Sequence, residues 1–264
     1  MTVIDYKSMG KRKILLVEDV VMNQDLACRL LQGWGMEVDV ASNGREAVEK
    51  VSENSYDIVL MDIQMPEMDG VEATRVIRKM PDYVKAGLPI IAVTANTLKT
   101  DKELYISAGM NDILAKPFTE EGLFRIMGSQ LGVQINSEME KMLPNENNQP
   151  NTPLYDLTMV RSVSGGDESF VLKMVDLFLT TIPQSLVEMR QQCTAMDWIA
   201  VGKSAHKLKS TIDSLGILYL KQDIRLLEKY GRNNENVTLM PSLVDKVVDG
   251  MEACISRIKK DFKV

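Results

Sequence analysis

The stretch Ile14-Leu-Leu-Val-Glu-Asp19 decides the fold of the N-terminal half of this 264-residue chain. Its apolar run is too short for a helix and does not alternate with polar residues. It therefore predicts a strand buried on both faces, as in parallel sheets. The run ends at two carboxylates, Glu18 and Asp19. The same design, an apolar run that ends in a polar residue, recurs along this half of the chain.

Four more apolar runs follow, at residues 36–41, 58–61, 90–93 and 113–115. Stretches with helical spacing flank them, at residues 21–31, 46–51, 71–80, 99–108 and 119–131. This alternation predicts an α/β domain whose central parallel sheet is covered by helices on both faces. We expect a doubly wound, flavodoxin-like sheet of five strands in the order 2-1-3-4-5.

Polar residues end four of the five predicted strands. Asp62 ends the third, Thr94 the fourth and Lys116 the fifth, while Glu18 and Asp19 end the first. In the order 2-1-3-4-5 these four ends are neighbours, at the edge where such sheets bind ligands. Clustered carboxylates repel one another unless a cation or proton offsets them, and oxygen ligands favour Mg²⁺. Asp62 is then the candidate nucleophile that forms an aspartyl phosphate, with Lys116 and the Thr94 hydroxyl stabilising the transferred group.

Motifs at these strand ends resemble the receiver domain of two-component response regulators. They are Val17-Glu-Asp19, Met61-Asp-Ile-Gln-Met-Pro-Glu-Met-Asp-Gly70, Val93-Thr-Ala95 and Ala115-Lys-Pro-Phe118, with Asn23-Gln24 and Asn43-Gly44 similar to receivers of hybrid sensor kinases. The resemblance implies that Asp62 accepts a phosphoryl group from a kinase phosphohistidine. It also implies that Glu18, Asp19, Asp62 and the backbone carbonyl of Gln64 hold Mg²⁺, and that a cis peptide precedes Pro117.

One position in this half departs from the family pattern. Ile113 stands where receivers usually carry Tyr or Phe, three residues before the lysine, so switching by an aromatic side chain is not expected here. Gln64 and Asn96 occupy positions that flank the phosphate in similar receivers and could tune its lifetime. Asp69-Gly70 is interpreted as a turn and a helix N-cap without chemistry.

The second half has a different character. From residue 133 to 153 the sequence is polar and broken by prolines, which predicts a linker. It separates a receiver domain at 13–132, preceded by a tail at 1–12, from a domain at 154–264. In that domain apolar residues recur at three-four spacing, which predicts a four-helix bundle with a short leading helix. Gly216 and Gly231 are expected at helix ends, and Pro241 in a first helical turn.

His206 is the only histidine of the chain. We expect it on a helix that starts after the N-cap Asp197, at the edge of the apolar stripe. Gly202 and Ser210, one turn before and after it, are small and would leave the imidazole accessible. Lys209 lies three residues after His206 on the same face of the helix, where its ammonium could attract phosphoryl oxygens.

The string Ala205-His-Lys-Leu-Lys209, followed by Leu215-Gly216, resembles the histidine-containing phosphotransfer domain. That family is a helical bundle with one exposed, phosphoaccepting histidine, and it usually has Gly at the position of Ser210 and Asn at that of Ser214. The resemblance implies that His206 exchanges a phosphoryl group with a receiver aspartate. This aspartate is either Asp62 or one on a partner.

Composition narrows the classes of function. The formal net charge is −6, so the chain lacks the excess of basic residues that binding to nucleic acid would require. The three cysteines share no CxxC spacing, and neither a signal sequence nor a run of eighteen apolar residues is visible, so we expect a cytoplasmic protein without direct membrane insertion. No GxxxxGK[ST] pattern is present, and a lone histidine leaves none for a kinase domain. The chain is therefore predicted to transfer phosphoryl groups without being an ATP-dependent enzyme.

Together these features predict a phosphorelay protein that works with a sensor histidine kinase and a downstream receiver or response regulator. One alternative is a scaffold or regulatory binding protein with a degenerate acceptor domain, which Ile113 and Ser210 keep open. Another is a Mg²⁺-dependent phosphatase, which would need a second acid-base carboxylate close to Asp62 and a pocket for small phosphoesters. Neither the motif nor the pocket is recognisable in the sequence.

Overall fold

The computed structural model describes residues 4–94, 99–116, 118–133 and 153–264. The predicted linker lies almost entirely outside these residues, as do Asn96 and the peptide before Pro117. Internal contacts divide the chain into two compact units, Met1–Asn145 and Glu146–Val264.

The N-terminal unit is built on a five-stranded parallel sheet. Its strands are β1 (Lys13–Val17), β2 (Glu37–Ala41), β3 (Ile58–Asp62), β4 (Ile90–Thr94) and β5 (Asp112–Ala115). Their order is β2-β1-β3-β4-β5, which confirms the predicted topology. In the register of this sheet, Leu16 lies between Val40 of β2 and Leu60 of β3. The carboxyl ends of β1, β3, β4 and β5 are therefore adjacent.

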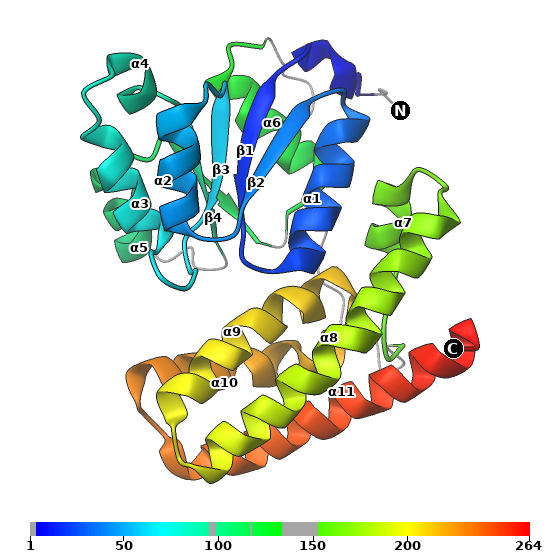
Figure 1. Ribbon diagram of the computed structural model, residues 1–264. Coiled ribbons are helices and arrows are strands. Elements are labelled where there is room, and N and C mark those ends of the chain that lie inside the picture. Colours follow the sequence, from blue (N-terminus) through cyan, green and yellow to red (C-terminus); the bar gives the residue numbers. More distant parts are fainter. Residues whose placement is uncertain (1–3, 95–98, 117, 134–152) are drawn as a thin grey trace. The chain divides into compact units, whose positions relative to one another are not determined.

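Helices cover both faces of this sheet. They are α1 (Val21–Gly33), α2 (Gly44–Glu53), α3 (Gly70–Arg78), α5 (Lys99–Ser107) and α6 (Glu120–Gln130). Figure 1 shows α1 and α6 on one side of the sheet and α2, α3 and α5 on the other. Alternate strand residues, such as Leu15 and Val17, join one apolar cluster with α2, α3 and α5. The residues between them, such as Ile14 and Leu16, are also buried, so both faces of the sheet form core.

Two single turns of this unit were not predicted, η1 (Tyr6–Met9) and α4 (Tyr83–Ala86). The ring of Tyr6 stacks on Trp34 with centroids 5.2 Å apart. The side chain of Asp82 caps α4 by accepting from the backbone N–H of Val84 at 2.9 Å. Four residues are too few to display a 3.6-residue period, so apolar patterning cannot predict such a turn.

The described residues of the C-terminal unit, 153–264, form helices and turns, as predicted. A short leading helix, α7 (Thr158–Ser164), precedes α8 (Glu168–Thr194), α9 (Trp198–Ser214), α10 (Lys221–Asn233) and α11 (Met240–Phe262), with short 3₁₀ turns η3 (Leu218–Leu220) and η4 (Val237–Leu239) between them. Helix α9 packs against α8 and α10, and α11 packs against the same two helices. Pro241 lies in the first turn of α11, where its missing N–H costs no helical bond.

Among the described residues, α8 alone is long and apolar enough to cross a membrane by length and composition. Its apolar side chains have another use in this unit. Phe178, Ile182 and Leu186 are buried within the helical bundle. The apolar composition of α8 is therefore accounted for in part by the bundle core.

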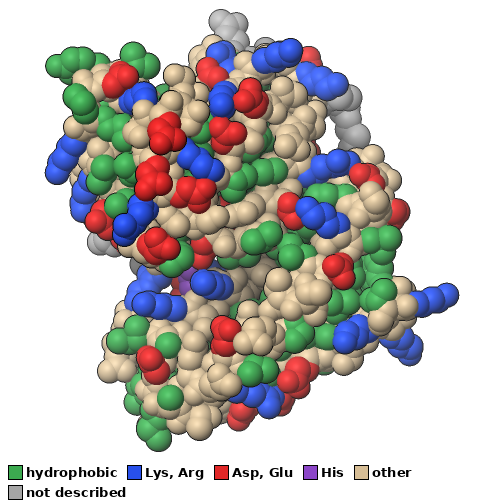
Figure 2. Space-filling model, viewed as in Figure 1, with side chains coloured by type: hydrophobic (Ala, Val, Ile, Leu, Met, Phe, Trp, Pro, Cys, Tyr) green, Lys and Arg blue, Asp and Glu red, His purple; other side chains and the backbone are tan. Residues whose placement is uncertain are grey.

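Over the visible surface, Figure 2 shows acidic and basic side chains interspersed.

Two glycines allow α9 and α10 to approach closely. A Cβ on Gly231 would lie 2.5 Å from the carbonyl oxygen of Trp198 and 2.6 Å from the Cα of Gly202. Gly231 therefore lies at a helix crossing and also in the last turn of α10, which ends at Asn233, so its predicted place near a helix end is confirmed. The prediction for Gly216 is confirmed, because this residue follows α9 with a positive φ of 58°.

Candidate functional site

The sheet brings the predicted polar residues together at one edge. Glu18, Asp19 and Asp62 each offer a carboxylate oxygen, and these oxygens lie within 4.8 Å of one another. The ammonium of Lys116 lies 2.5 Å from Oε2 of Glu18 and 2.6 Å from Oδ2 of Asp62. Thr94 ends β4 beside them and is buried.

Lys116 is the cation that holds two of these carboxylates. Its side chain is 14% exposed, while those of Glu18 and Asp62 are 6% and 5% exposed. Burial alone would lower the pKa of Lys116, but the carboxylates of Asp62 and Glu18 raise it above its ordinary value. Lys116 is therefore a permanent positive charge at this edge of the sheet.

Among the carboxylates of the cluster, Glu18 has a raised pKa. Burial, opposed by Lys116 and reinforced by the charge of Asp62, raises its pKa to about 7. Three carboxylates around one ammonium leave an excess of negative charge. A hard divalent cation such as Mg²⁺ fits this donor set of carboxylate oxygens. Glu18, Asp19 and Asp62 are the side chains that would hold it, and the Gln64 backbone, whose N–H lies 3.2 Å from Oδ1 of Asp62, is next to them.

The loop after β3 is folded tightly against Asp62. Asp69 caps α3 by accepting from the backbone N–H of Glu72 at 2.8 Å, so the interpretation of Asp69 as an N-cap is confirmed. The sequence did not reveal the role of Gly70. A Cβ at this position would lie 2.1 Å from the backbone oxygen of Asp62. Only glycine lets the start of α3 pass so close to the candidate nucleophile.

We therefore expect Gly70→Ala to move Asp62 and destabilise the N-terminal unit. Relieving the clash requires backbone shifts that cost about 2 kcal/mol, and a displaced nucleophile slows phosphoryl acceptance by about 100-fold. Urea unfolding and the rate of phosphorylation by acetyl phosphate measure the two effects. Gly33→Ala is the matched control, because a Cβ there meets nothing within 4 Å. Equal behaviour of the two variants would contradict this role of Gly70.

Ile113, which replaces the usual aromatic residue, packs against the apolar cluster on the side of α3 and α5. Tyr105 of α5 belongs to the same cluster and is 3% exposed.

In the helical unit, His206 lies on α9. The predicted N-cap is confirmed, because the side chain of Asp197 accepts from the backbone N–H of Ala200 at 3.0 Å. Nδ1 of His206 lies 2.8 Å from Oε1 of Glu228 on α10, and the imidazole is 16% exposed. A neutral imidazole that donates from Nδ1 keeps the lone pair of Nε2 for chemistry.

Glu228 is a buried partner of His206 that the sequence did not predict. Besides His206, it pairs with Lys209, and its Oε1 accepts from Arg232 at 3.2 Å. Burial would raise the pKa of Glu228, but the hydrogen bond from His206 and the charge of Lys209 lower it to about 2. A signal existed, because Glu228 interrupts the apolar series Ile224, Leu227 and Gly231 on the buried side of α10. A charge on such a face needs a buried partner.

Two expectations about the surroundings of His206 are wrong. Lys209 is 3% exposed, and burial lowers its pKa although Glu228 is adjacent. Its ammonium therefore holds Glu228 instead of facing solvent, because a buried charge must be paired. Gly202 is buried against Gly231 and serves helix packing. Ser210, on the other side of His206, is partly exposed.

The low pKa of Glu228 predicts an acid-labile helical unit. A carboxylate whose folded pKa is about 2 and whose ordinary pKa is 4.5 stabilises the fold fully above pH 4.5. This contribution is lost as the pH falls toward 2. We expect the wild-type chain to lose more unfolding free energy than Glu228→Gln between pH 5 and about pH 3. Urea titrations at both pH values measure the difference, and parallel losses would contradict the prediction.

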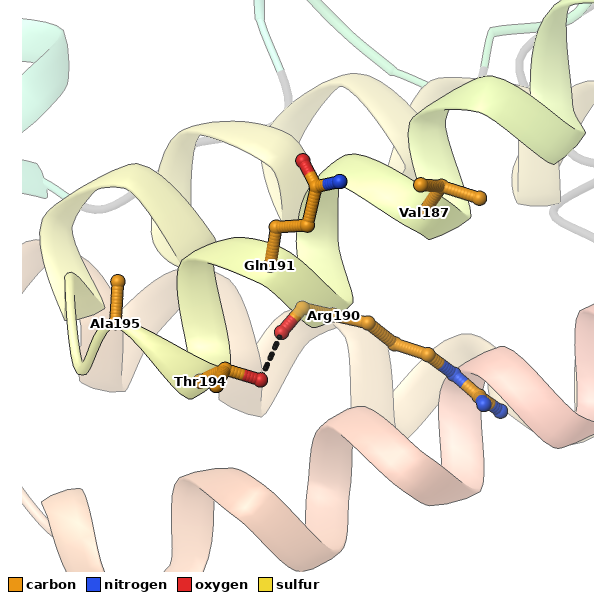
Figure 3. A pocket seen from close by; sticks show the side chains of 5 residues that line it. All are labelled: Val187, Arg190, Gln191, Thr194 and Ala195. Atoms are coloured by element: carbon orange, nitrogen blue, oxygen red, sulfur yellow. Dashed lines mark hydrogen bonds between the residues drawn. The ribbon is translucent and has the colours of Figure 1, made fainter.

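A surface depression of about 450 Å³ lies elsewhere in this unit, on the C-terminal turns of α8. Figure 3 shows that it is lined by Val187, Arg190, Gln191 and Thr194 of this helix and by Ala195, which directly follows it. The Thr194 hydroxyl donates to the backbone oxygen of Arg190, and Arg190 itself pairs with Asp249 of α11 at 2.9 Å. The depression thus brings together no nucleophile and base.

Comparison with known families assigns both units. Residues 14–127 match the response regulator receiver domain, and residues 173–261 match the Hpt domain.

Two curated relatives of the chain are a sensor protein and a histidine-protein kinase. The chain is 32% identical over 211 residues to the aerobic respiration control sensor protein ArcB of Escherichia coli strain K12. The matched region covers 79% of this chain and 26% of ArcB. It is 28% identical over 246 residues to the signal transduction histidine-protein kinase BarA of the same strain. This matched region covers 90% of this chain and 26% of BarA. The chain thus spans about a quarter of the length of each relative.

Among solved structures, the receiver domain of the sensor histidine kinase PA1611 from Pseudomonas aeruginosa PAO1 is 41% identical. The match covers 47% of this chain and 99% of that domain, with a TM-score of 0.44. That domain was crystallised with a magnesium ion coordinated in its active site cleft.

Proposed function

Because this chain joins a response regulator receiver domain to an Hpt domain and so belongs to the proteins of phosphorelay signalling, we propose that Asp62 and His206 are its two phosphoryl carriers. The observation that carries this proposal is the cluster at the carboxyl ends of the strands. There a buried aspartate lies beside one lysine and two further carboxylates. Each carrier stands in the domain whose family has such an acceptor.

In the first step a carboxylate oxygen of Asp62 attacks the phosphorus of a phosphohistidine in line with the P–N bond. The new P–O bond forms as the P–N bond breaks, and the imidazole leaves with its electron pair. Lys116 and the hydroxyl of Thr94 are placed to stabilise the negative charge of the equatorial oxygens. Mg²⁺ held by Glu18, Asp19 and Asp62 would supply further positive charge to the transferred group.

In the second step Nε2 of His206 attacks the phosphorus of an aspartyl phosphate, and the aspartate carboxylate leaves. Glu228 accepts the hydrogen bond from Nδ1, which keeps the proton on that nitrogen and the lone pair on Nε2. As positive charge develops on the ring, the carboxylate of Glu228 stabilises it. Lys209 and Arg232 hold Glu228 in place.

We infer that the chain is a carrier of phosphoryl groups in the cytoplasm and does not use ATP directly. Its partners are a sensor histidine kinase and a receiver domain or response regulator. Both acceptor residues are present, and nothing in the comparisons favours a degenerate scaffold. Carboxylates do lie near Asp62, as a phosphatase would need, but Glu18 is engaged by Lys116 and Asn23.

The test is to incubate the chain with acetyl phosphate and Mg²⁺ and to map the label by mass spectrometry under non-acidic conditions. Label on Asp62 supports the receiver assignment, and additional label on His206 shows transfer within or between copies. A folded chain that stays unlabelled in the presence of Mg²⁺ would contradict the proposal. Steady release of phosphate from small phosphoesters would favour the phosphatase instead.

A further inference from the structure

Asn23 on α1 is not one of the clustered carboxylates, but it contacts one of them, Glu18. Its side-chain amide donates to Oε1 of Glu18 at 2.9 Å, and the backbone N–H of Val20 donates to the same oxygen at 3.3 Å. An oxygen of a carboxylate accepts two hydrogen bonds, so Oε1 is saturated. The other oxygen of Glu18, Oε2, faces Lys116 at 2.5 Å. One end of the carboxylate is thus anchored on α1 and the other is directed toward Lys116.

The next residue of α1 holds the backbone of the same glutamate. The amide of Gln24 donates to the carbonyl oxygen of Glu18 at 2.6 Å and lies 3.4 Å from the hydroxyl of Ser42. Two successive amides therefore fix both the carbonyl and the carboxylate of Glu18. The Glu18 side chain is 6% exposed, so little water is available to replace either contact.

We propose that Asn23 is a positioning residue for cation binding in the receiver unit, acting through Glu18. By holding Oε1, it presents a single oxygen of Glu18 to the cluster and leaves Lys116 shared with Asp62. Without this amide only the longer hydrogen bond from the N–H of Val20 holds Oε1, so the carboxylate of Glu18 can rotate toward Lys116. The ammonium is then drawn away from Asp62, and the oxygens that would surround a cation are displaced. The assignment of this cluster to the cation rests on the proposed function.

The size of the effect follows from the behaviour of metal sites. Hydrogen-bond partners of ligating carboxylates change metal affinity by about 10- to 100-fold when they are removed. Asn23→Ala is expected to fall at the lower end, about tenfold, because the N–H of Val20 still holds Oε1.

The experiment is a calorimetric titration of the full chain with MgCl₂, for wild type, Asn23→Ala, Glu18→Ala and the double variant. We expect Asn23→Ala to raise the Kd for Mg²⁺ about tenfold. In the Glu18→Ala background it should change Kd by less than about twofold, because the contact through which it acts is gone. Gln32→Ala removes an exposed amide from the same helix and serves as the matched control. An unchanged Kd in Asn23→Ala, or an equal loss in both backgrounds, would overturn the proposal.

Phosphorylation kinetics give a second readout. With acetyl phosphate, Asn23→Ala should need more Mg²⁺ for half-maximal rate and reach the wild-type rate at saturating Mg²⁺. A lower maximal rate with unchanged Mg²⁺ dependence would contradict a role in cation binding. The calorimetric titration needs no phosphodonor. A chain that binds Mg²⁺ with the expected coupling but never labels Asp62 would therefore refute the proposed function alone.

Discussion

Replacing Asp62 by Asn is expected to leave the chain folded and unable to take up a phosphoryl group from acetyl phosphate. The amide is not a nucleophile at neutral pH, and Glu18, the other buried carboxylate of the cluster, is held by Asn23 and Lys116. The mass of the intact protein after incubation with acetyl phosphate and Mg²⁺ measures this directly. A variant whose receiver unit still gains a phosphoryl group, located by peptide mapping, would contradict the assignment.

The same variant also tests the electrostatics of the cluster. In wild type, one ammonium is shared by two buried carboxylates, and the charge of Asp62 helps to raise the pKa of Glu18 to about 7. Asp62→Asn removes one of these like charges and keeps the contact between Lys116 and Glu18. Without divalent cations, its unfolding free energy should therefore be at least that of wild type. A clear loss of stability would show that the cluster is held together mainly through Asp62.

Replacing Glu228 by Ala is expected to have the largest effect in the helical unit. The Lys209 ammonium, 3% exposed, would remain buried without its partner, which costs about 3 kcal/mol in unfolding free energy. The imidazole would lose the contact that holds Nδ1, so transfer to and from His206 should slow by about 100-fold. Urea unfolding and single-turnover transfer assays measure the two effects. Glu228→Gln keeps an acceptor for Nδ1 and should recover part of the transfer rate.

Asp223→Ala provides the matched control on the same helix. Asp223 is also buried, but its partner, Lys246 of α11, is 63% exposed and can turn to water. The control should therefore lose less stability than Glu228→Ala and transfer phosphoryl groups at the wild-type rate. Equal losses of transfer in the two variants would mean that Glu228 acts only through the stability of the bundle.

The receiver cluster could be predicted because its information is local. Each strand is a short apolar run, and its last residue stands at the carboxyl edge whatever the surrounding helices do. Once the strand order is known, Asp62, Thr94 and Lys116 must be neighbours. The role of Gly70 could not be predicted, because its close approach to the Asp62 carbonyl depends on the path of the loop in space. Apolar patterning does not encode that path.

The surroundings of His206 were harder to predict because they depend on two helices. The apolar stripe placed His206 correctly on α9, but the residue that faces it comes from α10. That pairing is set by the crossing of Gly202 and Gly231, where the helix backbones approach too closely for any side chain. Patterning along one helix reveals neither the crossing nor the buried contact between Lys209 and Glu228.

The most direct test of the two-carrier account is transfer between two single-acceptor variants. His206→Gln is first labelled on Asp62 with acetyl phosphate, freed of the reagent, and then mixed with Asp62→Asn in the presence of Mg²⁺. The account predicts that label leaves Asp62 and appears on His206 of the other variant as an acid-labile, base-stable phosphoryl group. Label that is lost only to water, while folded Asp62→Asn remains unlabelled, would contradict the claim that these two residues exchange phosphoryl groups.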